Sequence, residues 1–194
     1  MENELNQINQ KLALVEEHLN SDNLLAAIKE YRLILKLDSS NISALVGISD
    51  CLLKMKMGGD AEEFARRAYG LYGERDDMTA VNYSCVLSDL GNYSEAIEIL
   101  EKENLKNSTN YLVYNNLGYY YFLTEKFDKA LTNYNISIAM NETNPLAYCN
   151  RGNLKYFIFN DEDGIRDLER AHSYGDFEAG MILQNITGSK VLLS

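Results

Sequence analysis

Residues 111–144 read YLVYNNLGYYYFLTEKFDKALTNYNISIAMNETN, and their apolar side chains recur at three- and four-residue steps. In the first half, Leu117 and Tyr121 fall on one face of a predicted amphipathic helix. A polar break follows at 124–126, and a second helix is predicted to begin at Phe127. The stretch therefore predicts two antiparallel helices joined by a short turn.

Small residues mark the point where the two helices of such a pair would cross. In the predicted second helices the series is Ala27, Ala61, Ala96, Ala130 and Gly164. In the predicted first helices it is Val15, Ser49, Ser84, Gly118 and Gly152. Both series advance by 34, 35, 34 and 34 residues, so they agree on where one extra residue falls. Five repeats are predicted, at about 8–41, 42–76, 77–110, 111–144 and 145–178.

The order of Leu117-Gly118, Tyr121, Ala130 and Tyr134 within 34 residues resembles the tetratricopeptide repeat. The segment LGNYSEAIEIL at 90–100 is similar to the turn of that family. The resemblance implies an all-α fold, a right-handed α-solenoid of about five tetratricopeptide helical hairpins. A further helix at 177–187, ended by Gly188, is expected to cap the last hairpin, because the end of a solenoid must be covered. Residues 1–194 are expected to form a single tetratricopeptide repeat domain.

Local signals predict where some helices begin. Ser21 or Asp22 is expected to cap the second helix of the first repeat. In the second repeat, Gly58-Gly59 is expected to form the turn and Asp60 to cap the helix that follows.

The formal net charge of −11 makes phosphate-rich partners unfavourable, so neither nucleic acid nor a membrane is expected as a partner. The N-terminal residues lack the basic and apolar regions of a signal peptide. Three widely spaced cysteines without a Cys-x-x-Cys motif favour reduced thiols, and a cytoplasmic location is predicted. The two histidines lie at opposite ends of the array. No catalytic set, metal site or cofactor motif is evident, so no enzyme activity is predicted.

The fifth repeat places Arg151 and Lys155 at positions that are normally apolar. We expect them to form ion pairs with Asp163, Asp167 or Glu169 on the following helix, because a buried cation needs a partner.

By resemblance to the family, the first helix of each repeat lines a concave groove. This resemblance assigns to the partner-binding groove Asp50, Asp89, Asn115, Tyr119, Phe122, Leu123, Cys149, Asn153, Tyr156 and Phe157. The N-terminal part would be acidic, with Glu16 beside Asp50 and Asp89. The C-terminal part would be aromatic, and aromatic side chains with polar tips are common binding anchors. The alternative is that some of these rings fill the inside of a narrow superhelix or contact the C-terminal tail.

Asn82, Asn116 and Asn150 also recur every 34 residues. They would hold the main chain of a ligand or, equally, the backbone of their own repeat.

The predicted function is protein–protein interaction: a scaffold or adaptor that holds an extended peptide or a partner helix, with a basic segment beside an apolar one. The alternative is a dedicated partner of one protein, such as a secretion chaperone or a toxin-neutralising immunity protein. The chain is expected to be a monomer or a weak homodimer.

Overall fold

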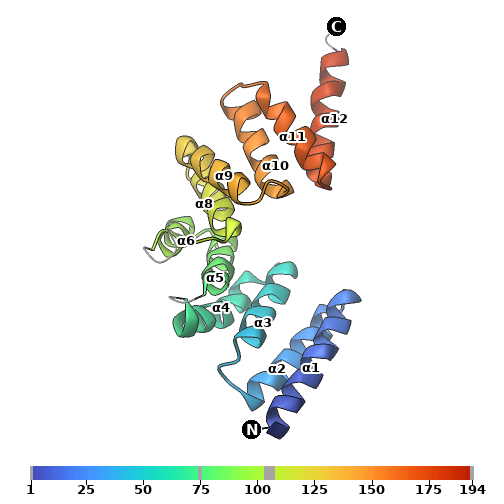
Figure 1. Cartoon of the computed structure of the whole chain (residues 1–194), viewed down its shortest axis with the longest axis vertical. Helices are drawn as coiled ribbons and strands as arrows, with labels where there is room; N and C mark the ends of the chain where they lie inside the picture. Colours follow the sequence, from blue (N-terminus) through green and yellow to red (C-terminus); the bar gives the residue numbers. More distant parts are fainter. Residues whose placement is uncertain (1, 74–75, 103–107, 193–194) are drawn as a thin grey trace. The chain divides into compact units, whose positions relative to one another are not determined.

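Helices follow one another along the chain, and a short turn joins the two helices of each hairpin (Figure 1). The computed structural model describes residues 2–73, 76–102 and 108–192, and no strand occurs among them. The elements are α1 (Glu2–Asn20), α2 (Leu24–Leu37), α3 (Ile42–Lys54), α4 (Gly58–Tyr72), α5 (Asp77–Asp89), α6 (Tyr93–Leu100), α8 (Tyr111–Leu123), α9 (Phe127–Met140), α10 (Pro145–Asn153), the π-helical turn η1 (Leu154–Ile158), α11 (Asp163–Ser173) and α12 (Phe177–Leu192).

Asn and Asp side chains begin several of these helices, since their oxygens accept hydrogen bonds from the exposed N–H groups of the first turn. The capping residues are Asn23 for α2, Asn41 for α3, Asp76 for α5 and Asn110 for α8. The predicted caps Ser21 and Asp22 were wrong. Asn23 takes this place because Asp22 adopts a left-handed conformation in the turn before it.

Gly58 and Gly59 belong to the first turn of α4 and do not form the preceding turn. Asp60 lies inside that helix, so its prediction as a cap was wrong. Lys56, with a φ of 60°, reverses the chain instead. A side chain at Gly58 would overlap the carboxylate of Asp89. Close packing at this position therefore explains one of the two glycines.

One residue in each hairpin turn has a positive φ. The series is Asp22, Lys56, Gly91, Glu125 and Asn160. In the first four hairpins this residue lies five positions before the small residue of the second helix, whereas Asn160 lies only four before Gly164. The π-helical turn η1 accounts for the difference, because it adds a residue to the preceding helix.

Contacts within the chain divide it into two compact units, residues 1–104 and 105–194. The first unit holds the hairpins α1/α2, α3/α4 and α5/α6. The buried small residues at their crossings include Ala27, Ala61 and Ala96. The expectation of one continuous domain remains a prediction.

The second unit holds the hairpins α8/α9 and α10–η1/α11, followed by α12. Ala179 and Ile186 of α12 are buried against Leu168 and Ala171 of α11. The helix covers the last hairpin in the way a capping helix does. It extends to Leu192, past the predicted end at Gly188.

Candidate functional site

In the first unit, a side-chain hydrogen bond connects the first helices of two successive hairpins. The Nδ2 of Asn82 on α5 donates to Oδ1 of Asp50 on α3 at 2.6 Å. Neither of the two roles expected for Asn82 accounts for this bond, because its donor contacts a side chain of the previous repeat. Such a partner could not be read from one repeat alone.

The two acidic residues predicted for the groove lie in this unit, and both are exposed. Although Asp50 as a whole residue is exposed, its surroundings partly desolvate the carboxylate and raise its pKa above the ordinary value, and the hydrogen bond from Asn82 opposes that rise. Asp89 lies at the end of α5, against Gly58 at the start of α4. A carboxylate beside a helix N-terminus is favoured by the helix dipole.

Asn82 also carries an acceptor that no described residue satisfies. The residue is only 5% exposed, and its Oδ1 has no hydrogen-bond donor among the parts of the chain that the structure describes. A buried polar atom without a partner costs free energy, so an additional donor would be favourable here. An N–H group from a ligand main chain or a basic side chain has the required chemistry.

A comparable link joins α8 and α10 in the second unit. The Nδ2 of Asn150 donates to Oδ1 of Asn115 at 3.3 Å, and Asn115 in turn donates to Asn116 at the same distance. Asn115 is buried. The recurring asparagines therefore help to hold neighbouring first helices together.

The three remaining predicted groove residues of α8 differ in exposure. Tyr119 is 42% exposed, whereas Phe122 and Leu123 are half-buried. The ring of Phe122 packs against Phe127 with centroids 5.8 Å apart. Of these three side chains, Tyr119 is the one best placed to meet a partner.

Tyr156 and Phe157 lie in the π-helical turn, with their rings in edge-to-face contact at 4.9 Å. Tyr156 packs against the core of the unit, while Phe157 is 59% exposed. Among the described residues, no ring contact joins this pair to Tyr119 or Phe122. The grouping of all four rings into one binding surface remains a prediction.

Cys149 is buried on α10 and accepts a weak hydrogen bond from Nδ2 of Asn153 at 3.9 Å. Burial raises the pKa of the Cys149 thiol to about 12, with smaller contributions from Asp176 and Glu178. The Oδ1 of Asn153 is another buried acceptor without a donor in the described ranges, as is Oγ of Ser49 on α3. Asn153 thus resembles Asn82 in having unused hydrogen-bonding capacity on a first helix.

The ion pairs expected in the fifth repeat are present, and Asp167 is the partner. Arg151 binds it through two hydrogen bonds, from Nε at 2.8 Å and from Nη2 at 2.7 Å. Lys155 approaches the same carboxylate at 3.3 Å. Asp167 is 4% exposed, so this cluster belongs to the interior. Asp163, another candidate, pairs instead with Arg166 at the surface.

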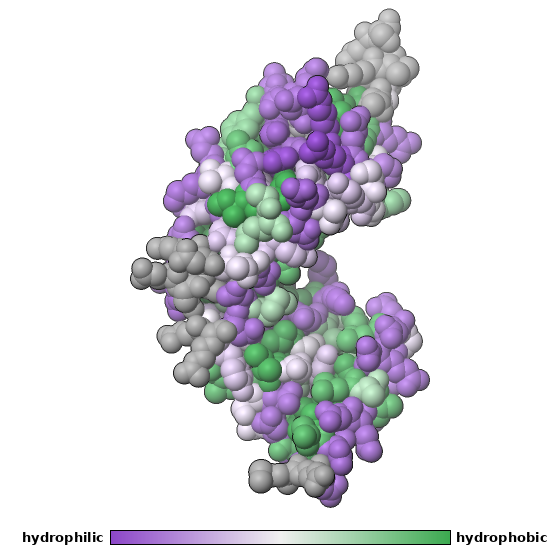
Figure 2. Space-filling view, in the orientation of Figure 1, coloured by the Kyte–Doolittle hydropathy of each residue, from purple (hydrophilic) through white to green (hydrophobic). Residues whose placement is uncertain are grey.

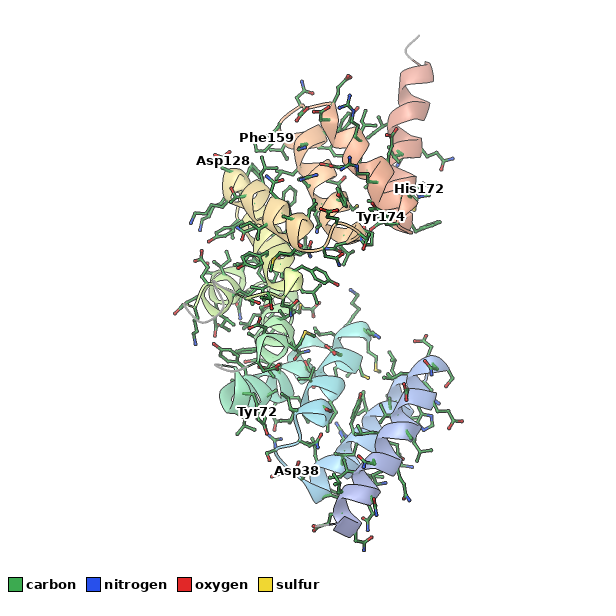
Figure 3. All side chains as sticks on the ribbon, in the orientation of Figure 1. Asp38, Tyr72, Asp128, Phe159, His172 and Tyr174 are labelled. Atoms are coloured by element: carbon green, nitrogen blue, oxygen red, sulfur yellow. The ribbon has the colours of Figure 1, made fainter. Side chains whose placement is uncertain are left out.

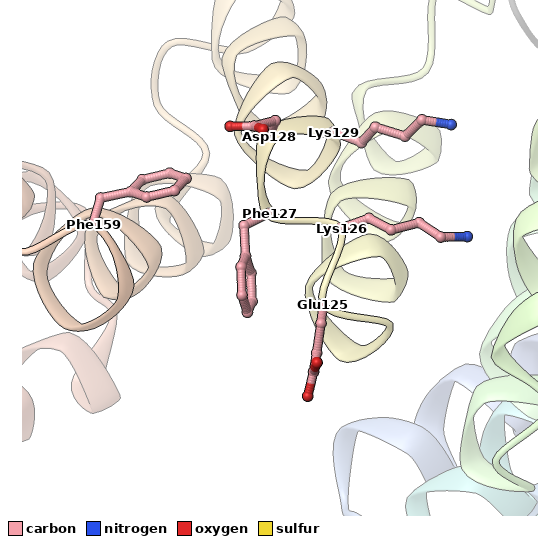
Figure 4. Close-up of a pocket in the computed structure, with 6 residues that line it drawn as sticks. All are labelled: Glu125, Lys126, Phe127, Asp128, Lys129 and Phe159. Atoms are coloured by element: carbon pink, nitrogen blue, oxygen red, sulfur yellow. The ribbon is translucent and has the colours of Figure 1, made fainter.

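The structure adds a cavity of about 320 Å³ that sequence reasoning missed (Figure 4). Phe127 at the start of α9 and Phe159 after the π-helical turn provide its apolar walls. Lys126 and Lys129 also line it, but their side chains extend away from the two Phe rings, and their ammonium groups lie over the ring of Tyr121 (Figure 4). Phe159 enters this cavity because of a turn that the repeat pattern does not predict.

Figure 2 shows hydrophobic and hydrophilic residues intermingled over the face that it draws. Within the described ranges, no group of three or more His, Cys, Asp or Glu residues is arranged to hold a metal ion. No described helix is long and apolar enough to cross a membrane.

Comparison with known proteins bears on the fold. A tetratricopeptide repeat model matches residues 79–102, which cover most of α5, the turn after it, α6 and the next two residues. No curated protein matches the sequence.

Solved structures match over most of the chain. A thermophilic tetratricopeptide protein of Thermus thermophilus has a TM-score of 0.78 and 16% identity, covering 95% of this chain and 99% of that one. For pilF of Pseudomonas aeruginosa the TM-score is 0.77, with 18% identity and coverage of 97% and 87%. YrrB, described as a tetratricopeptide protein with an unusual peptide-binding site, gives 0.60, with 18% identity and coverage of 90% and 90%. At these identities the likeness concerns the fold, and the predicted all-α solenoid fold is confirmed.

Proposed function

Because this chain is a tetratricopeptide repeat protein, we propose that it binds another protein through the faces of its first helices. The fold is in general a scaffold for protein–protein interaction, since its stacked hairpins present extended surfaces. The occupant we propose is an extended peptide or a partner helix. YrrB, which shares the fold, is described as having a peptide-binding site.

The observation that carries the proposal is that two side-chain amides on first helices each have an unsatisfied acceptor. Asn82 on α5 and Asn153 on α10 each hold a buried Oδ1 without a donor among described residues. Side-chain amides of this kind can accept hydrogen bonds from peptide N–H groups whatever the sequence of the peptide. Both atoms are enclosed in the described structure, so a ligand main chain would reach them only after each amide turns toward the surface.

The side chains around these acceptors suggest what the partner carries. In the first unit, Asp50 and Asp89 favour a basic segment. In the second unit, the exposed rings of Tyr119 and Phe157 favour an apolar segment. Tyr156 is less suitable as an anchor because it packs on the core.

The test begins with a partner captured from the native host and identified by mass spectrometry, which is then titrated against variants. Replacing Tyr119 and Phe157 together by Ala should weaken binding by about 2 kcal/mol or more. Asp50→Asn/Asp89→Asn should slow association and reduce its salt dependence. Ile136→Ala, on the exposed side of the second helix α9, serves as the control and should change neither the affinity nor the association rate.

If both groups of variants fold normally and bind the partner as the wild type does, the first-helix faces are not the binding site. Reduced binding in Ile136→Ala alone would place the partner on the second helices.

A further inference from the structure

A second candidate surface lies in the first unit, between α2 and the end of α3. It is a cleft of about 620 Å³, within the size range of protein ligand sites. The lining residues are Leu25, Ile28, Lys29, Arg32, Leu33 and Lys36 of α2, Leu52 of α3, and Met55 and Met57 just after it. None of them belongs to the groove predicted from the sequence.

The apolar lining of this cleft is partly open to solvent. Leu25 is 68% exposed and Met57 is 39% exposed, while Ile28 and Leu52 are buried beneath. Leaving large apolar side chains in water is unfavourable, so a partner that covers them gains free energy. Methionine side chains are flexible and polarisable, and they adapt well to apolar surfaces of different shapes.

The charged residues that line the cleft are all basic, whereas the chain as a whole is acidic. Three of the nine lining residues are basic and none is acidic, although the chain carries a formal net charge of −11. Lys29, Arg32 and Lys36 follow one another along α2 at steps of three and four residues, over about 10 Å of helix. No described residue forms an ion pair with them, whereas the neighbouring Glu30 pairs with Lys11 on α1 at 3.2 Å.

The turn that follows the α2 wall of the cleft is tied to α4 by hydrogen bonds. Arg67 and Tyr72, from α4, donate hydrogen bonds to the carbonyl oxygens of Ser39 and Ser40, both at 3.0 Å. Asp38 accepts hydrogen bonds from the N–H and hydroxyl groups of Ser40, which lower the pKa of its carboxyl group (Figure 3). These bonds fix the end of the α2 wall to α4.

We propose that this cleft docks an acidic amphipathic helix of another protein. Its apolar stripe would cover Leu25 and the two methionines, and its carboxylates, at steps of three and four residues, would face the three basic side chains. A lipid surface fits less well, because the chain as a whole is repelled by an anionic leaflet. Nucleic acid fits less well too, because the lining has no aromatic ring on which bases could stack.

The proposal is tested with a phage-displayed library of random 16-residue peptides selected on the full chain. Prior adsorption to the variant Lys29→Glu/Arg32→Glu removes peptides that bind elsewhere, including the first-helix faces. The expected survivors carry Asp or Glu at helical spacing beside an apolar stripe. Their affinity should fall at least tenfold in Lys29→Glu/Arg32→Glu and at least fivefold in Leu25→Ser. Both variants change exposed positions, and circular dichroism should show that they remain folded.

Two controls separate this site from general electrostatic attraction. Arg66→Glu reverses an exposed charge on α4 outside the cleft, and it should leave affinity within twofold of wild type. A peptide with its acids changed to Lys should bind Lys29→Glu/Arg32→Glu better than it binds the wild type.

Several results would overturn the proposal. These are the absence of surviving peptides, survivors without an acidic excess, or equal losses in Arg66→Glu and Lys29→Glu/Arg32→Glu. Binding that survives Leu25→Ser unchanged would exclude an amphipathic partner. If the chain self-associates in sedimentation experiments and Lys29→Glu/Arg32→Glu abolishes this association, the occupant of the cleft would be a second copy of the chain. If the chain floats with phosphatidylserine vesicles and the same variant abolishes this flotation, the occupant of the cleft would be a lipid surface.

Discussion

The hairpins α5/α6 and α10–η1/α11 occupy equivalent places in the repeat, yet their helices cross in different ways. In α5/α6 the crossing is filled by Ser84 and Ala96, both fully buried. In α10–η1/α11 the same positions are Gly152 and Gly164, and a Cβ at Gly152 would lie 2.8 Å from the carbonyl oxygen of Gly164. Backbone thus contacts backbone in the second hairpin, where side chains separate the helices of the first.

The polar groups of the two hairpins differ as well. The first helix of α5/α6 makes one side-chain bond to an exposed carboxylate, that of Asp50. The α10–η1/α11 hairpin encloses Arg151, Lys155 and Asp167 in its interior. Hairpins with the same repeat pattern can therefore be stabilised in two ways. One uses small side chains at the helix crossing, and the other uses direct backbone contact together with buried charges. The second arrangement should be more sensitive to single substitutions.

The largest effect should follow removal of the buried charge in the second arrangement. Asp167→Asn leaves Arg151 and Lys155 largely buried without a countercharge, so the free energy of unfolding should fall by about 3 kcal/mol or more. Urea denaturation followed by circular dichroism measures the change.

The matched control is Asp163→Asn, because Asp163 forms an exposed ion pair with Arg166 on the same helix. An exposed pair of this kind contributes less than about 1 kcal/mol. Equal losses in the two variants would mean that burial of the cluster does not matter.

The thiols of the two hairpins should differ in reactivity. Only the thiolate is nucleophilic, and with a pKa of about 12 the thiol of Cys149 is almost entirely protonated at neutral pH. Cys85 on α5 is only partly buried. A disulfide reagent such as DTNB should therefore modify Cys85 at least about 100-fold faster than Cys149 in the folded protein. Comparable rates in single-cysteine variants would show that α10 opens readily.

Exchanging the small residues at the two helix crossings should lower the stability of the protein by unequal amounts. Gly152→Ser introduces a Cβ against the backbone of Gly164 and should cost about 2 kcal/mol of stability. The reverse change, Ser84→Gly, should cost less than about 1 kcal/mol, chiefly through helix propensity. Thermal melts of both variants measure the costs. Similar melting temperatures would indicate that the glycine crossing can widen at little expense.

The smallest effect concerns Asp50, the carboxylate that bonds α5. Its pKa is raised in the folded protein, so the folded state favours the protonated form and loses stability as the pH rises through the carboxyl titration range. Asp50→Asn keeps an acceptor for Asn82 without the charge. Between about pH 3 and pH 7, wild-type stability should decline relative to this variant, by less than about 1 kcal/mol because the carboxylate is exposed. A relative gain for the wild type would show that its charge is stabilising.

The regular parts of this structure were predictable because small residues and apolar faces repeat along the sequence. The series through Gly118 and Ala130 located the hairpins. Because Arg151 and Lys155 occupy normally apolar positions, the sequence also limited their expected ion-pair partners to three acidic residues. The choice of Asp167 among them required three-dimensional geometry.

Other features depend on contacts between repeats or on the details of a turn. The hydrogen bond from Asn82 to Asp50 joins residues 32 positions apart, so no local pattern reports it. The π-helical turn packs closely against Gly164, where a Cβ would meet the backbone nitrogen of Tyr156 at 2.7 Å. That turn adds about 100° of rotation to the residues after it, which shifts Phe159 from the direction that regular helical spacing assigns.

Photocrosslinking in the native host tests binding at the first-helix faces without requiring the partner to be known. A photoreactive phenylalanine would replace Tyr119 or Phe157 on first-helix segments, and Ile136 on the second helix α9 as the control; all three positions are exposed. The proposed function predicts a discrete protein adduct from Tyr119 and Phe157 and none from Ile136. An adduct from Ile136 alone, or none from the first two positions, would contradict binding at the first-helix faces.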